Sequence, residues 1–83
     1  MSTDEVVDSV RTACADVLEI APDAVVPGAD LREDLGADSL DIAEVYTALE
    51  DVWGLEILDQ EVFASVATVA DVVEQVRRLR EAM

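Results

Sequence analysis

The residues best placed to do chemistry lie in one short segment, Leu35-Gly-Ala-Asp-Ser-Leu-Asp41. Gly36 permits a backbone with positive φ, and Asp38 is a good N-cap for a helix in which Ser39 is the first residue. A hydroxyl at that position lies beside unpaired N–H groups and the positive end of the helix dipole, which favours a phosphate attached to it. Position and spacing alone favour a second capping role without chemistry for Ser39.

The composition excludes most self-contained catalytic groups. The chain has no histidine and no lysine, so it has no Ser-His-Asp triad, no imidazole metal ligand and no Schiff-base lysine. Its single cysteine, Cys14, falls on the apolar face of the first predicted helix and is interpreted as a core residue. A carboxylate two or three residues away does not activate Ser39 as a nucleophile. We therefore predict that the chain is not an enzyme and has no catalytic residue of its own.

An acid-rich stretch that begins at Asp30 invites a test for calcium binding. An EF-hand loop starting there needs oxygen ligands at its third and fifth positions and glycine at its sixth. The third position is Arg32 and the sixth is Leu35, so only Asp34 and the final Asp41 fit. We predict no dedicated metal site.

Charge narrows the choice of partner. The 83 residues include 20 acids and five arginines, for a net charge of −15. Such a surface repels nucleic acid and anionic membranes, and it favours basic protein surfaces that are approached by electrostatic steering. From Glu33 through Glu74 there are twelve acids and no base. A role in solubility alone also accounts for the acids, if composition is considered by itself.

The spacing of apolar residues predicts a small all-α protein, a single domain over residues 1–83. We expect three long helices and one short one in an antiparallel four-helix bundle, with a long loop between the first two helices. A capping box at Ser2 begins the first helix, which ends at or slightly before Pro22. The loop spans residues 21–37, with a short turn at 31–35, and its apolar anchors are Val25, Val26, Leu31 and Leu35.

The later helices carry similar signals. A second helix follows Asp38, with Asp41 as a weaker capping-box partner, and Gly54 ends it in a left-handed conformation. A short third helix begins near Asp59. Thr68 caps the last helix with Asp71 at its third position. Its apolar stripe consists of Val69, Val72, Val73, Val76 and Leu79.

The second helix has two distinct faces. At 100° per residue, its core face contains Ile42, Val45, Tyr46, Leu49, Val52 and Trp53. The opposite face is acidic, with a thin apolar strip of Leu40, Ala43 and Thr47 between Glu50 on one side and Glu44 and Asp51 on the other. A mimic of nucleic acid would instead spread its acids over every face, so this division disfavours that function.

The sequence resembles the acyl carrier proteins, of the free-standing fatty-acid or polyketide type. The likeness rests on Asp38-Ser-Leu40 within its turn, on the second helix with Glu50-Asp51, on Glu56-Ile57, and on Thr68-Val69 at the start of the last helix. It covers essentially the whole chain. Leu58 and Phe63 depart from the fatty-acid pattern, which leaves open whether the pathway makes fatty acids or polyketides.

The resemblance implies that Ser39 carries 4′-phosphopantetheine, whose thiol bears acyl groups as thioesters, with Asp38 and Leu40 beside the attachment point. A pantetheinyl transferase would load the arm, and acyltransferase and ketosynthase-type enzymes with basic docking surfaces would use it. The implied docking residues are Asp38, Leu40, Asp41, Ala43, Glu44, Thr47, Glu50 and Asp51. The implied acyl pocket is bounded by Ile42, Val45, Tyr46 and Leu49, and the protein is expected to be cytoplasmic and monomeric.

A second function remains open from the residues themselves. An acidic helical module that docks basic proteins and is never modified would share the charge and the helix pattern. Modification of Ser39 separates the two functions.

Overall fold

The computed structural model describes residues 5–54, 56 and 65–81. Within them, the helices are α1 (Glu5–Leu18), the 3-10 helix η1 (Pro22–Ala24), α2 (Ser39–Trp53) and α4 (Val69–Glu81). The described residues form no strand, only an isolated antiparallel bridge between Asp30 and Thr68. The predicted all-α class is therefore confirmed. The predicted capping box at Ser2 and the short helix near Asp59 lie outside the described residues.

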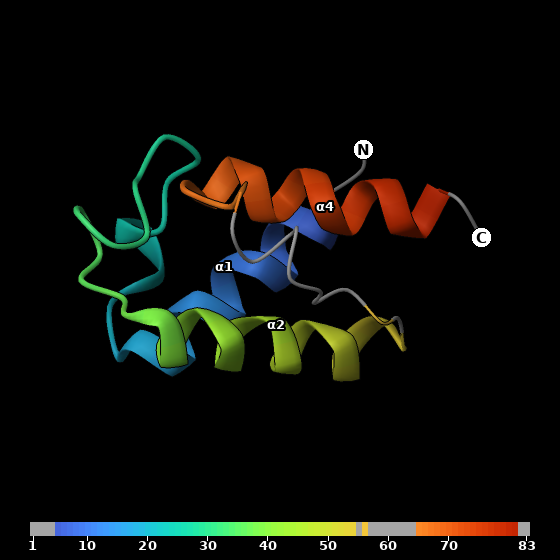
Figure 1. Ribbon diagram of the computed structural model, residues 1–83, viewed down its shortest axis with the longest axis horizontal. Coiled ribbons are helices and arrows are strands. Elements are labelled where there is room, and N and C mark those ends of the chain that lie inside the picture. The colour runs from blue at the N-terminus through green and yellow to red at the C-terminus, as the bar shows by residue number, and fades with distance from the viewer. Residues whose placement is uncertain (1–4, 55, 57–64, 82–83) are drawn as a thin grey trace.

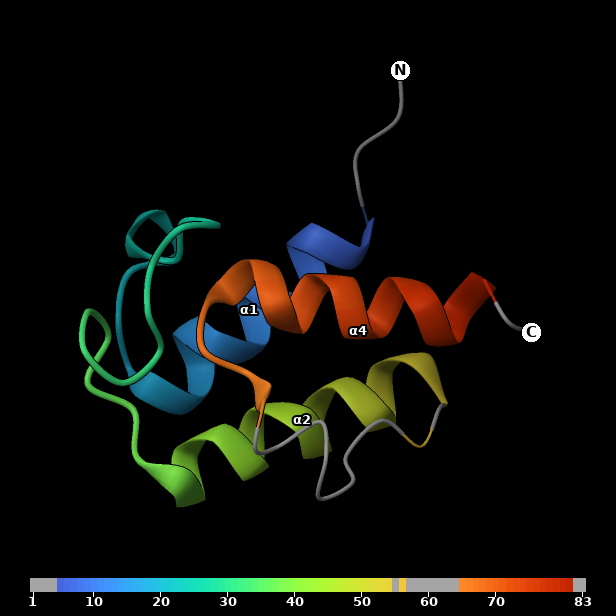
Figure 2. The ribbon, with the colours of Figure 1, turned by 45° about the horizontal axis from the view of Figure 1, so that its top comes forward.

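The helices are arranged around α1 (Figures 1 and 2). The helix α1 runs antiparallel to α2 and to α4, whereas α2 and α4 run in the same direction and begin at the same end of the molecule. That end also contains the connection between α1 and α2. The shared starting end follows from the bridge between Asp30 and Thr68, which fixes the beginning of α4 beside this connection.

A backbone hydrogen bond caps the C-terminal end of α1. Glu19 adopts a left-handed conformation with φ of 56°, and the N–H of Ile20 donates to the carbonyl of Ala15 at 3.1 Å. This six-to-one bond is the Schellman arrangement that satisfies a free carbonyl at a helix end. The helix accordingly stops at Leu18, slightly before Pro22 as the sequence predicts.

The core consists of the apolar stripes of the three described α-helices, together with residues of the connection. Its fully buried side chains include Val6, Val10, Cys14, Val25, Leu31, Ile42, Tyr46, Leu49, Val72 and Val76. Leu35 and Trp53 are partly buried against it.

Two predicted core residues are in fact exposed. Val52 is 62% exposed, at the edge of the apolar arc of α2, where the facing residues of α1 are mostly polar: Asp8, Ser9, Thr12 and Asp16, with Ala13. Val26 is 49% exposed, because the loop turns there and its neighbour Val25 enters the core instead. Both predictions were wrong because helical or local spacing does not say which neighbouring element covers the edge of a stripe.

One junction joins the three described α-helices. The indole Nε1 of Trp53 in α2 donates to Ser9 Oγ in α1 at 2.9 Å, and this hydroxyl donates to the carbonyl of Val6. The guanidinium of Arg80 in α4 lies 4.9 Å from the centroid of the Trp53 ring and 3.8 Å from a carboxylate oxygen of Glu5. Trp53 thus lies at the end of the core and is the cation–π partner of Arg80 in α4.

Burial gives Cys14 a measurable effect on stability. Burial raises the pKa of its thiol from 9.0 to about 11. The unfolded chain therefore loses this proton first, so the free energy of unfolding falls as pH rises from 9.0 to about 11. In the unsubstituted protein, the fall in the free energy of unfolding over this pH range is on the order of 2 kcal/mol. We expect this fall to be absent in Cys14→Ala. The measurement is urea unfolding at a series of alkaline pH values.

The control is Tyr46→Phe, because burial also raises the pKa of Tyr46, with smaller contributions from Asp71 and Cys14. Tyr46→Phe removes the fall in the free energy of unfolding that begins above the ordinary tyrosine pKa of 10.0. It leaves the fall that is due to Cys14. An alkaline slope in Cys14→Ala that matches the unsubstituted protein would contradict the assignment.

Candidate functional site

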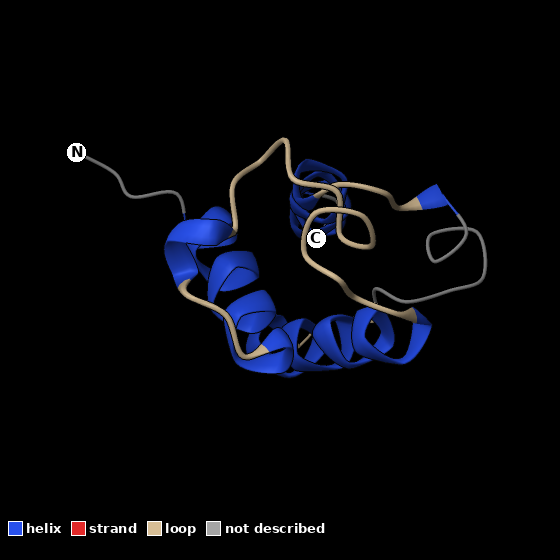
Figure 3. Cartoon of the chain, turned by 90° about the vertical axis from the view of Figure 1, so that its left-hand side faces the viewer, coloured by secondary structure: helices blue, strands red, loops and turns tan. Residues whose placement is uncertain are grey.

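The connection between α1 and α2 is fixed to the start of α4 by backbone hydrogen bonds. The N–H of Leu31 donates to the carbonyl of Ala67 at 2.8 Å, and the N–H of Val69 donates to the carbonyl of Ala29 at 3.0 Å. Leu31 also accepts at its carbonyl from the N–H of Ala37 at 2.8 Å. The connection passes close to the first turn of α4 (Figure 3). Because Ala37 is two residues before Ser39, these bonds position the beginning of α2.

A tight turn follows Asp30, as the sequence predicts for residues 31–35. The carboxylate Oδ1 of Asp30 accepts from the N–H groups of Arg32 and Glu33, each at 2.9 Å. Asp34 returns a bond, its Oδ2 accepting from the N–H of Asp30 at 2.8 Å. These two acids thus stabilise the turn. Within the described residues, no group of three His, Cys, Asp or Glu side chains is arranged to hold a metal ion.

A reciprocal capping box begins α2. Asp38 Oδ1 accepts from the N–H of Asp41 at 2.9 Å, and Asp41 Oδ2 accepts from the N–H of Asp38 at 3.2 Å. Gly54 ends the helix with φ of 65°, in the left-handed conformation that glycine adopts without strain. Both predicted ends of this helix are confirmed.

Ser39 is exposed at the first position of α2. The described residues offer no acceptor for the N–H groups of Ser39 and Leu40, so the positive end of the helix is open to an anion there. The hydroxyl Oγ of Ser39 accepts from Nη1 of Arg32 at 3.3 Å. An accessible oxygen therefore lies between two unpaired N–H donors and a guanidinium.

The residues of the implied docking set lie along the accessible face of α2, as the spacing predicts. Asp38, Leu40, Glu44, Thr47 and Asp51 are exposed, and Asp41, Ala43 and Glu50 are partly exposed. Leu40 is 67% exposed, which is a high value for a large apolar side chain. The arrangement brings an apolar strip and carboxylates to one side of the helix that starts at Ser39.

The four residues implied for an acyl pocket, Ile42, Val45, Tyr46 and Leu49, are buried in the core. Tyr46 is 0% exposed, and the described residues give its hydroxyl no hydrogen-bond partner. A buried hydroxyl without a partner costs about 1–3 kcal/mol. Their role in holding an acyl chain stays a prediction.

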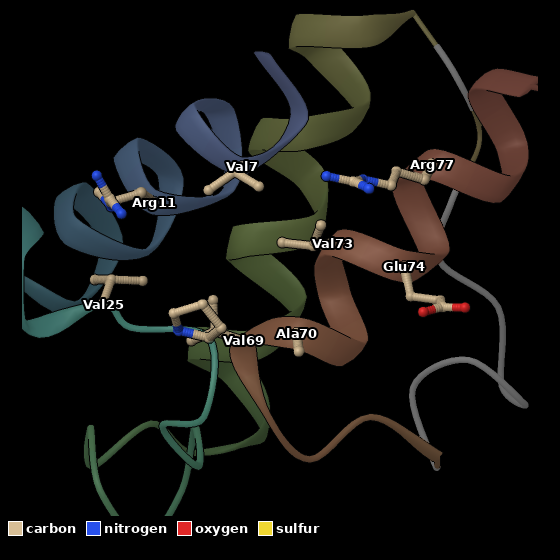
Figure 4. A pocket seen from close by; sticks show the side chains of 9 residues that line it. Val7, Arg11, Val25, Val69, Ala70, Val73, Glu74 and Arg77 are labelled. Carbon is tan, nitrogen blue, oxygen red and sulfur yellow. The ribbon is translucent and has the colours of Figure 1, made fainter. Parts of the chain in front are cut away.

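A separate, mostly apolar pocket among the described residues lies between α1 and α4 (Figure 4). It has a volume of about 280 Å³, and Val7 and Arg11 of α1 face Val73 and Arg77 of α4 across it. Val25 and Pro27 complete its lining near the connection. None of its lining residues comes from α2, so it is separate from Ser39 and from the predicted acyl pocket.

Arg32 is the residue of the site that sequence reasoning missed. In the sequence, Arg32 stands out only as a misfit in a calcium loop, because seven positions separate it from Ser39. The available signal was its charge, since Arg32 is followed by no other base until Arg77.

Comparisons with known proteins agree with this geometry. Residues 8–76 match the family described as "Phosphopantetheine attachment site". An acyl carrier protein of Thermosynechococcus vestitus is 43% identical over 74 residues, which are 89% of this chain and 90% of that protein. An acyl carrier protein of Campylobacter hominis is 42% identical over 77 residues, 93% and 96% of the two chains.

The helical fold and the family match define a carrier domain that takes a phosphopantetheine group. The chain belongs to the acyl carrier proteins, which are carriers and not enzymes. Within the residues that the structure describes, no helix has the length and apolarity needed to cross a bilayer.

The described residues fit the 4′-phosphopantetheine group. The hydroxyl of Ser39 is exposed, the N–H groups of Ser39 and Leu40 have no described acceptor, and Arg32 is within hydrogen-bond distance of the oxygen. A phosphodiester formed at this oxygen would be an anion, and the two N–H groups and the guanidinium would stabilise its charge. When bound, the group supplies a terminal thiol on a flexible arm.

The capping box yields a test of local stability. We expect Asp38→Ala to lower the free energy of unfolding by about 0.5–2 kcal/mol, because the N–H of Asp41 loses its acceptor. Loosening the start of α2 should also slow loading of Ser39. Urea unfolding at neutral pH measures the first effect.

Asp51→Ala is the matched control, since it removes an exposed acid of the same helix that does not cap it. Its effect should stay within about 0.5 kcal/mol of zero. Equal destabilisation by both substitutions would mean that charge, and not the cap, accounts for the loss.

Proposed function

We propose that Ser39 is the attachment point of 4′-phosphopantetheine, and that the arm carries acyl intermediates of fatty acid or polyketide synthesis as thioesters. The observation that carries this proposal is an exposed hydroxyl at the first position of α2, beside a guanidinium and N–H groups that have no acceptor among the described residues. Asp38 and Leu40 flank the attachment point, and Asp38 caps the start of α2. Residues 1–83 act in this proposal as one acyl-carrier domain, with the four-helix bundle that the sequence predicts.

Loading requires a separate pantetheinyl transferase. Ser39 Oγ forms a bond to the phosphorus of the pantetheine phosphate of coenzyme A. The bond from that phosphorus to the oxygen that bridges it to the second phosphate of coenzyme A breaks. Adenosine 3′,5′-bisphosphate leaves with the electron pair of that bond. The serine proton passes to a base of the transferase, because the described surroundings of Ser39 contain only carboxylates used in capping and turn formation. The chain's own contribution is to present the hydroxyl and to stabilise the anionic product.

The acidic face of α2 is the proposed docking surface for the transferase and for acyltransferase and ketosynthase-type enzymes. Its carboxylates would meet basic side chains, and its strip of Leu40, Ala43 and Thr47 would make the apolar contact. Exposed ion pairs are each worth about 0.2–1 kcal/mol, so they set rate and orientation more than affinity. Weak, steered contacts suit a carrier that must leave each enzyme.

Loading of Ser39 is tested by intact-mass spectrometry after incubation with coenzyme A, Mg²⁺ and a pantetheinyl transferase. We expect the protein to gain one phosphopantetheine group, Ser39→Ala to gain none, and Ser65→Ala to gain it normally, since Ser65 is an exposed serine elsewhere. A wild-type protein that never gains mass would favour the alternative function, an unmodified acidic interaction module. A gain that survives in Ser39→Ala would show that the group is attached elsewhere.

The docking face is tested by association kinetics of the loaded protein with a ketosynthase-type enzyme. We expect Glu44→Gln with Asp51→Asn to slow association severalfold, and added salt to slow it as the screening length shrinks. The control, Asp16→Asn with Asp23→Asn, removes the same charge from exposed positions outside α2. Equal slowing by both pairs would mean that net charge, and not this face, governs association.

A further inference from the structure

Arg32 has an unusual partner for an arginine in so acidic a protein. Its Nη1 donates to the neutral hydroxyl of Ser39 at 3.3 Å. The structure places no described carboxylate within ion-pair distance of it, although Arg78 and Arg80 on α4 pair with Glu74 and Glu5. Arg32 is thus held at the serine and not by an acid.

Four acids near the start of α2 already accept hydrogen bonds from the backbone. Asp30 accepts from two N–H groups of the turn, and Asp34 accepts from the N–H of Asp30. Asp38 and Asp41 bond to each other's N–H groups in the capping box. Carboxylates oriented in this way stabilise the local fold, and their bonding leaves the guanidinium directed at Ser39.

The backbone of Arg32 is also held in place by its neighbours. Its own N–H donates to Asp30, and the preceding Leu31 is 1% exposed and bonded to Ala67 at the start of α4. The side chain therefore extends from a rigid turn toward the start of α2. Because the backbone of Arg32 is already fixed, its guanidinium loses less conformational entropy when it forms an ion pair.

We infer that Arg32 is a positioning residue that pairs with the phosphodiester of the attached arm. The inference rests on the proposed attachment at Ser39. After loading, Ser39 Oγ becomes a bridging ester oxygen, and the two non-bridging oxygens that share the negative charge are each two P–O bonds away from it. A guanidinium already in contact with Oγ reaches them with its parallel N–H donors, the geometry in which arginine binds phosphate.

The pairing has a consequence for the arm. The phosphodiester adds negative charge beside Asp38 and Asp41 on a chain whose net charge is already −15. Arg32 offsets this repulsion and, by holding the phosphate, restricts the root of the arm while leaving its thiol end free.

The test is NMR on the protein before and after loading, with complete loading verified by intact mass. In the wild-type protein, we expect the side-chain Nε–Hε resonance of Arg32 to shift on loading and that of Arg78, which pairs with Glu74, to stay in place. In the loaded proteins, we expect Arg32→Gln to move and narrow the ³¹P resonance, Arg32→Lys to have a smaller effect, and Arg78→Gln to have none. The two glutamine variants change net charge equally.

The outcomes separate this inference from the proposed function. Failure of the wild-type protein to gain mass overturns attachment itself. A loaded wild-type protein with an unmoved Arg32 resonance overturns the pairing alone, and so does a ³¹P spectrum that Arg32→Gln leaves unchanged. The wild-type comparison decides the question even if a substitution lowers loading.

Discussion

Two backbone hydrogen bonds made by Leu31 determine where Ser39, the proposed attachment point, lies. Its N–H bonds to Ala67 at the start of α4, and its carbonyl accepts from Ala37, just before α2. The side chain of Leu31 is buried at the same time, so the connection is fixed by packing as well as by hydrogen bonds. Without this constraint, a connection of this length would be free to carry the start of α2 through many positions. With it, Ser39 and Arg32 form one rigid corner.

The acids of this corner have different uses, although composition makes them look alike. Asp30, Asp34, Asp38 and Asp41 accept from backbone N–H groups and stabilise the turn and the helix start. Glu44 and Asp51 lie exposed further along α2 and are available to basic partners. A similar division occurs at α4, where hydrogen bonds from the N–H groups of Thr68 and Ala67 lower the pKa of Asp71. The large net charge thus combines acids that stabilise the local fold with exposed acids on α2, the proposed docking surface.

Much of this could be predicted from the sequence, because the signals are local. The capping boxes of Asp38 and Thr68, the left-handed Gly54 and the buried stripe of α2 each depend on residues a few positions apart. The exposure of Val26 and Val52 could not, since it depends on which element lies opposite. The bonds from Leu31 to Ala67, from Trp53 to Ser9 and from Arg32 to Ser39 likewise join residues that no periodicity connects. The attachment chemistry was predictable as a family resemblance, whereas the arginine at the serine was not.

The constraint at Leu31 is tested most directly by amide hydrogen exchange in the unloaded protein. The N–H groups of Leu31 and Ala37 should exchange as slowly as those within α2, although both lie in a connection between helices. The N–H of Gly36, which has no described acceptor, serves as the internal reference for a fast-exchanging loop amide. Slow exchange at Leu31 and Ala37 alone among these three is the predicted result. Exchange of all three at the same fast rate would contradict the account, because Ser39 would then have no fixed place at the head of α2.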